Sequence, residues 1–186
     1  MTSYCETALG HPVHGPYHDY EYGFPIDDEA GLFERLTLEI FQAGLSWLII
    51  LKKRDAFRLA FENYRVDRIA AFDAVDIERL MNDPSIIRNR RKIEAIIQNA
   101  KVVQDLRNTY GGFGRWIEAH HPLSRMEWCK LFRATFSFMG KEVVGEFLMS
   151  IGYLPGAHTD QCPIYRRIAE KDPAWLRGVP RTGTAG

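Results

Sequence analysis

Four side chains near the two ends of the chain are of the types that bind metal ions. His158 and Cys162 are separated by three residues, a spacing at which two ligands reach one ion from consecutive helix turns or a tight loop. Cys5 and His18 would complete a tetrahedral Cys2His2 shell, which would be structural because catalytic zinc keeps an open position. Because Cys5 and His18 lack finger-like spacing, the spacing alone fits two buried cysteines and scattered histidines equally well.

Two glutamates lie within apolar sequence and are candidates for acid chemistry. Glu39 follows Leu38 and precedes Ile40 near the end of a predicted helix, where partial burial would tune its ionisation. The pattern alone favours the alternative, an exposed acid on the polar face of an amphipathic helix. Glu146 stands in the apolar run 143–149, and there too an exposed position is favoured over a functional cleft.

Aromatic residues near His18 could bind another kind of ligand. Tyr17, Tyr20 and Tyr22 surround His18, and with Trp47 they could line a pocket, although core packing is the commoner role of such side chains.

The basic run enters the strongest predicted helix. Arg88, Arg90, Arg91 and Lys92, together with the free backbone N–H groups of a helix start, could bind a phosphate. A solvated helix start explains the same residues equally well. The run 52–54 is a second, weaker basic patch with the same ambiguity.

Helices must position these groups, since few segments alternate with period two. Apolar residues at helical spacing predict helices from residue 27 to Gly44, over 90–106 and over 141–151, with a turn at 82–85. The first 25 residues show no period and are expected to form an irregular arm, in which His11 and His14 are rival metal ligands. Residues 177–186 are expected to form a disordered tail.

Composition limits the class of protein. The 186 residues are 46% hydrophobic and 26% charged with zero net charge, which indicates a globular protein and gives no whole-molecule attraction to nucleic acid or membranes. Three cysteines cannot all pair, no signal peptide is visible, and the longest nearly apolar run is far shorter than the about 20 residues of a membrane span. We therefore expect a cytoplasmic protein with no membrane partner. P-loop, dinucleotide and nucleophile-elbow motifs are absent.

Several segments together resemble one known family. They are Tyr-His-Asp at 17–19, Gln-Ala-Gly-Leu-Ser-Trp at 42–47, Leu-Lys-Lys-Arg at 51–54, Ile-Ile-Arg-Asn-Arg at 86–90 and the pair His158 and Cys162. In order and spacing they are similar to 3-methyladenine DNA glycosylase I from about residue 5 to residue 162. The string at 42–47 is highly specific.

The resemblance implies an all-α member of the helix-hairpin-helix glycosylase superfamily. It implies one globular domain over 1–176, with a helical body at 26–145, a hairpin near 82–93, and a terminal lobe of 1–25 and 146–176 joined by a structural zinc. The implied zinc ligands are Cys5, His18, His158 and Cys162, and the implied base-facing acid is Glu39. The aromatic residues implied beside the base are Tyr17, Tyr22 and Trp47. The implied phosphate-binding cations are Arg88, Arg90, Arg91 and Lys92.

The implied activity is base-excision repair. Such an enzyme flips 3-methyladenine out of alkylated duplex DNA and hydrolyses its glycosidic bond without lyase activity and without a cofactor in the chemistry. A monomer is expected. The alternatives are a non-catalytic DNA-binding relative and a zinc-dependent interaction module.

Several positions depart from the family pattern and bear on substrate scope. Thr7 and Tyr22 replace tryptophans that are usual in relatives, so the walls of the pocket are expected to be thinner. Ile40 and Glu146 stand where small residues are common, and the stretch 121–130 is shortened.

Overall fold

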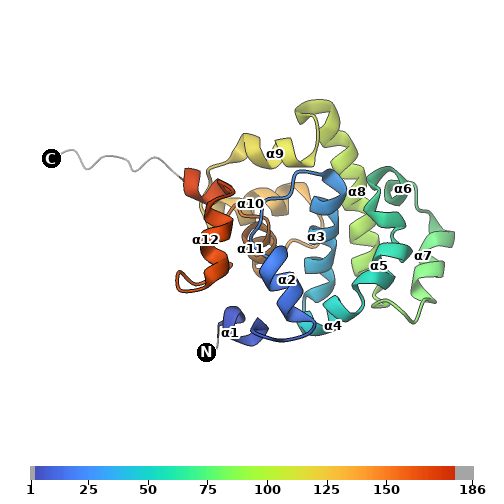
Figure 1. The fold of residues 1–186 in the computed structure, drawn as a ribbon. Helices are drawn as coiled ribbons and strands as arrows, with labels where there is room; N and C mark the ends of the chain where they lie inside the picture. Colours follow the sequence, from blue (N-terminus) through green and yellow to red (C-terminus); the bar gives the residue numbers. More distant parts are fainter. Residues whose placement is uncertain (1–2, 179–186) are drawn as a thin grey trace.

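The computed structural model describes residues 3–178, and all its regular elements are helical (Figure 1). This confirms the predicted all-α fold. The elements are α1 (Tyr4–Ala8), α2 (His14–Tyr20), α3 (Glu29–Gln42), α4 (Trp47–Lys52), α5 (Arg54–Ala60), η1 (Glu62–Tyr64), α6 (Val66–Ala70), α7 (Ala74–Met81), α8 (Arg90–Tyr110), α9 (Phe113–His120), α10 (Arg125–Thr135), α11 (Lys141–Ser150), α12 (Pro163–Ala169) and η2 (Ala174–Arg177).

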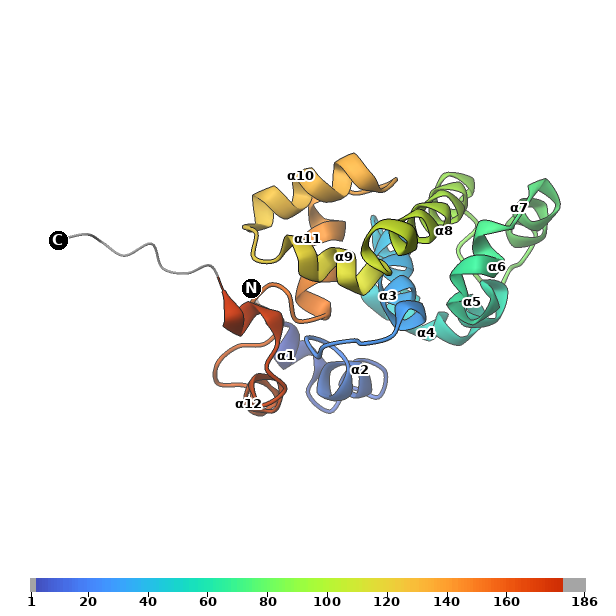
Figure 2. The ribbon, with the colours of Figure 1, turned by 90° about the horizontal axis from the view of Figure 1, so that it is seen from above.

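Helix α3 lies at the centre of the molecule (Figure 2). The Asp28 side chain caps it by accepting a hydrogen bond from the backbone N–H of Gly31, and all residues from 32 to 41 are buried. Helices α4, α6, α8, α9 and α11 pack against it. The exposed position that the sequence pattern alone favoured for Glu39 is therefore wrong, because the positions around it on α3 are all buried.

Helices α7 and α8 pack against each other and are joined by a hairpin loop. Asp73 begins α7 with a capping box, and residues 82–89 connect α7 to the 21-residue α8. Helix α8 runs to Tyr110, beyond the predicted end at residue 106, and stops where Gly111 adopts a φ of 85°. Its buried stripe includes the predicted Ile93, Ile96 and Val103.

The terminal segments are more ordered than predicted. The expected irregular arm contains α1 and α2, and α10 and α12 were not predicted. A capping box from Ser3 starts α1, and Pro16 lies within the first turn of α2, where no intrahelical N–H bond is lost. Short helices depend on tertiary packing more than on propensity, so a weak periodicity does not reveal them.

The first and last described helices lie at the same end of the molecule. In both views α1, α2 and α12 lie together, away from α5, α6 and α7 (Figures 1 and 2). A small buried cluster of Cys162, Ile164 and Ile168 packs there against Cys5 and Phe24.

The end of the chain is partly described. Arg177, at the start of the predicted tail, ends η2 and forms an ion pair with Glu118 at 2.9 Å, whereas residues 179–186 lie outside the described residues. None of the described helices is long and apolar enough to cross a membrane.

Candidate active site and metal centre

A cavity of about 260 Å³ opens beside the C-terminal half of α3. Four residues predicted from the sequence, Tyr17, Tyr22, Glu39 and Trp47, meet in its wall. The complete lining is Tyr4, Tyr17, Tyr22, Glu39, Gln42, Trp47, Glu146, Met149 and Gly156. Of these, Tyr4, Met149 and Gly156 were missed because no sequence motif marks them.

The aromatic rings form a continuous wall. The ring centroids of Tyr17 and Trp47 lie 5.1 Å apart, those of Tyr17 and Tyr22 5.7 Å, and those of Tyr4 and Tyr22 5.3 Å. The buried Nε1 of Trp47 has no hydrogen-bond partner within residues 3–178. Thr7, by contrast, is exposed on α1 and does not line the cavity, so Tyr4 supplies the ring on this helix. Such a wall suits a flat, π-bonded ligand.

Glu39 is a buried acid without a partner in the protein. Its side chain is 4% exposed, and it makes no hydrogen bond or ion pair with any described residue. Burial, and then the charge of Glu146, raise its pKa from 4.5 to about 8, against the opposing charge of Arg35. A buried carboxyl is normally hydrogen-bonded, so the fold leaves the oxygens of Glu39 for a ligand.

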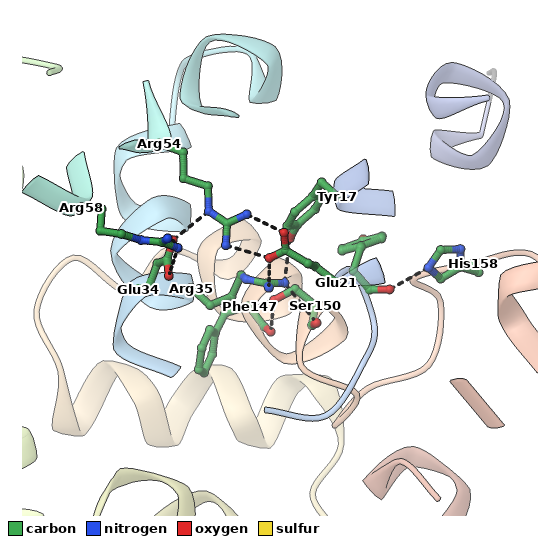
Figure 3. A network of polar contacts seen from close by, with 10 residues as sticks. Tyr17, Glu21, Glu34, Arg35, Arg54, Arg58, Phe147, Ser150 and His158 are labelled. Carbon is green, nitrogen blue, oxygen red and sulfur yellow. Dashed lines mark hydrogen bonds and ion pairs between the residues drawn. The ribbon is translucent and has the colours of Figure 1, made fainter. Parts of the chain in front are cut away.

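The hydroxyl of Tyr17 is positioned from behind by Arg35 (Figure 3). Arg35 Nη1 donates a hydrogen bond to the Tyr17 oxygen at 2.9 Å and another to the Ser150 carbonyl at 3.3 Å. Because this bond uses the oxygen as acceptor, the phenolic proton stays free to be donated. Burial raises the pKa of Tyr17, which keeps the proton in place.

Arg35 is held in turn by an ion-pair network (Figure 3). Its Nη2 donates to Glu21 at 3.3 Å, and Arg54 donates two bonds of 2.7 Å to the same carboxylate. Arg54 also donates to Glu34, which Arg58 contacts at 3.1 Å. Although burial opposes it, the hydrogen bond from Arg54 lowers the pKa of Glu21. Arg54, predicted to belong to a basic patch, is thus part of the support of the cavity.

Glu146 reaches the same cavity from α11. It is half-buried, and the Tyr22 hydroxyl donates a hydrogen bond to its Oε2 at 3.1 Å. Burial raises its pKa.

Cys5, His18, His158 and Cys162 form a second polar cluster. Their ligand atoms all lie within 4.8 Å of one another. Cys162 Sγ is 3.7 Å from His18 Nε2 and 3.6 Å from His158 Nδ1. Tetrahedral bonds of about 2.0–2.3 Å would place ligand atoms about 3.6 Å apart, so the four residues fit one metal ion.

In both histidines the ring nitrogen that does not face the other ligand atoms has a partner of its own. His18 Nδ1 lies 2.6 Å from Asp19 Oδ1, and His158 Nε2 lies 2.7 Å from the Tyr22 carbonyl. Such outer contacts fix the tautomer and ring orientation of metal-bound histidine. The rival ligands lie elsewhere: His14 contacts the Tyr4 hydroxyl, and His11 accepts bonds from backbone N–H groups.

The predicted basic cluster divides into two groups. Arg88, Arg90 and Arg91 are exposed at the hairpin and the start of α8, and Arg90 contacts Glu78. Lys92 is 5% exposed, and its Nζ donates to the carbonyls of Phe41 at 2.8 Å and Ala43 at 2.6 Å. The assignment of Lys92 to a phosphate site is therefore wrong, since its charge is used to cap α3.

The weaker basic patch also contributes to the fold. Lys53 Nζ donates to the carbonyl of Ser85 in the hairpin at 2.9 Å, so it supports the loop rather than facing solvent alone.

Known proteins are similar to this chain in sequence. Residues 7–128 match the family model described as methyladenine glycosylase. A DNA-3-methyladenine glycosylase of Haemophilus influenzae is 34% identical over 182 residues, covering 88% of this chain and 98% of the relative. DNA-3-methyladenine glycosylase 1 of Escherichia coli is 48% identical over 97 residues, 52% of each chain.

A solved structure agrees. The 3-methyladenine DNA glycosylase I of Staphylococcus aureus matches with a TM-score of 0.75 and 32% identity, covering 88% of this chain and 97% of that chain. With an unpaired acid and an aromatic wall in one cavity, and a family model that spans most of the chain, the resemblance inferred from the sequence is confirmed: the chain belongs to the methyladenine glycosylase family.

Proposed function

We propose that this protein removes 3-methyladenine from alkylated duplex DNA by hydrolysing the glycosidic bond. The observation that carries the proposal is Glu39, a buried carboxyl without a protein partner inside an aromatic cavity. A base must leave the helix stack before its glycosidic bond is accessible, so the cavity would receive the flipped base.

The cavity suits a cationic purine. An adenine nucleotide methylated at N3 carries a positive charge, and aromatic faces attract a cation by about 0.5–2 kcal/mol. Glu39 would accept a hydrogen bond from the exocyclic amine, which is strengthened by the opposite charges. Tyr17 and Trp47 would flank the ring, and Tyr22 would close the wall.

The reaction needs little help from the protein at the leaving group. The bond from C1′ to N9 breaks, its electron pair passes to the ring, and the ring becomes neutral. Water supplies the oxygen that binds C1′ and releases one proton. We propose a monofunctional reaction of this kind, without lyase activity.

We further propose that Cys5, His18, His158 and Cys162 bind one zinc ion with a structural role. Two thiolates and two imidazoles are a usual zinc set, and four protein ligands leave no open position for substrate. When bound, zinc would supply folding free energy by joining the two chain ends.

For DNA binding we propose the hairpin at 82–89 and the start of α8. Arg88, Arg90 and Arg91 are exposed there, and the helix start offers backbone N–H groups to a phosphate.

The test of the function is chromatographic detection of free 3-methyladenine released from methylated duplex DNA. The proposal expects release by the wild-type protein. Binding of the duplex without release of base would instead indicate a non-catalytic DNA-binding relative, and neither binding nor release would indicate an interaction module.

A further inference from the structure

The cavity contains a second carboxyl group that the function proposed above does not use. Glu39 enters from α3 and Glu146 from α11, and these two helices pack against each other. No lysine, arginine or histidine is among the lining residues that the structure describes. The cavity therefore contains two acids and four aromatic rings without a cation.

Glu146 is only partly satisfied by the protein. Tyr22 donates to Oε2, and no described residue donates a hydrogen bond to Oε1. Because Tyr22 also lines the cavity, its bond fixes the Glu146 carboxylate at the wall of the cavity.

No described cation forms an ion pair with Glu146. The charge of Arg125 on α10 favours ionisation of Glu146, but the Arg125 side chain is 42% exposed and its ion pair is with Glu142, at 3.6 Å. Glu142, on the same helix, and Glu39, across the cavity, add negative charge.

Two acids in one small cavity are costly while the cavity holds no cation. Each negative charge raises the free energy of ionising the other, and burial adds to this cost. A ligand with a positive charge removes both penalties, whereas a neutral ligand of the same shape removes neither. The pKa of Glu39 is raised partly by Glu146, which agrees with this electrostatic coupling.

We propose that Glu146 is a second recognition carboxylate, which acts together with Glu39 to select bases that carry a positive charge over neutral bases. This inference rests on the proposed glycosylase function. In the reaction the ring is cationic before the glycosidic bond breaks and neutral afterwards, so a second acid favours the damaged nucleotide over both the normal base and the released product.

A structural role for Glu146 gives a different expectation. If it only held Tyr22 in place, a glutamine would serve as well, because its amide oxygen accepts the same hydrogen bond. Glu146→Gln therefore separates the charge from the contact. Glu142→Gln is the matched control, since it removes one charge from the same helix outside the cavity lining.

The experiment compares two ligands that differ in charge. One is 3,9-dimethyladeninium, with a fixed positive charge, and the other is 3-methyladenine as the neutral free base. Binding of each is followed by the change in tryptophan fluorescence, to which Trp47 in the cavity wall is expected to contribute, for the wild-type protein and both variants, after melting curves confirm that the variants fold. The wild-type protein is also tested for release of 3-methyladenine from methylated duplex.

We expect Glu146→Gln to lower the ratio of cation to neutral affinity about tenfold, equivalent to about 1.4 kcal/mol, and Glu142→Gln to leave it unchanged. An unchanged ratio in Glu146→Gln, or an equal loss in both variants, would overturn the inference. If the wild-type protein still released 3-methyladenine, the proposed function would stand. Absence of release would overturn the proposed function itself.

Discussion

The cluster of Cys5, His18, His158 and Cys162 and the cavity lie side by side, but they satisfy their polar groups in opposite ways. In the cluster, both histidines use one ring nitrogen toward the other ligands and the second toward Asp19 or the Tyr22 carbonyl. In the cavity, Glu39 has no partner among the described residues and Glu146 has one. The first arrangement needs only an ion to be complete, and the second needs a ligand.

The two regions share Tyr22. Its backbone carbonyl orients His158 and its hydroxyl orients Glu146, so one residue joins the two sites. Loss of metal should therefore disturb the cavity, whereas loss of a cavity acid should leave the metal in place. Cys162→Ser and Glu39→Gln test this asymmetry from its two sides.

The largest effect is expected from Cys162→Ser. Structural zinc of this type contributes about 10 kcal/mol or more at neutral pH, and each kcal/mol lost lowers the melting temperature by about 2–4 °C in a chain of this size. The variant should lose zinc by metal analysis and melt more than about 10 °C lower. Cys129→Ser is the control, because Cys129 is also buried but lies outside the cluster. Equal metal content in both variants would contradict the assignment of ligands.

The next effect concerns Glu39→Gln, which keeps the size of the side chain and removes its charge. Loss of a positioned electrostatic group in an active site costs about 100-fold to 1000-fold in rate. Single-turnover excision should fall by about this factor while zinc content is unchanged, with Glu142→Gln as the control. Excision at the wild-type rate would show that Glu39 does not contact the base.

The same substitution should stabilise the protein at high pH. The pKa of Glu39 is about 8 in the folded chain and 4.5 in a free side chain, so the folded state binds the proton more tightly. Stability contributed by the protonated acid is complete below about pH 4.5 and is lost as pH rises to about 8, at about 1.4 kcal/mol per pH unit.

Glutamine does not titrate, so the gain in melting temperature of Glu39→Gln over the wild-type protein should grow between pH 5 and pH 8 and then level off. A gain that does not change with pH would place the Glu39 carboxyl in contact with water.

Parts of both regions could be predicted from the sequence, and the limits have physical causes. Long helices such as α3 and α8 show their period because several turns repeat it. The four residues of the cluster were grouped by the family resemblance, because their spacing alone fitted buried cysteines and scattered histidines equally well. Tyr4 was missed because α1 is too short to show a period and the chain returns to the cavity only through tertiary packing.

The role of Lys92 shows a further limit. A lysine beside three arginines suggests one basic surface, but its acceptors are carbonyls at the end of α3, far away in sequence. Sequence spacing does not reveal which side of a helix start faces another helix.

The smallest effect separates these neighbouring cations. Arg91 is exposed and would contact a phosphate, so Arg91→Ala should lower the slope of log affinity against log salt by about one and leave the melting temperature unchanged.

Lys92→Met keeps the bulk of the side chain but leaves the Phe41 and Ala43 carbonyls without their donor, at a cost of about 1–3 kcal/mol. It should lower the melting temperature and, because those carbonyls end the helix that carries Glu39, slow excision while the salt slope is preserved. Titrations of DNA binding over a range of salt, combined with melting curves, measure both effects. A reduced slope in Lys92→Met with unchanged melting would return Lys92 to the DNA-binding surface and would mean that the end of α3 is held without it.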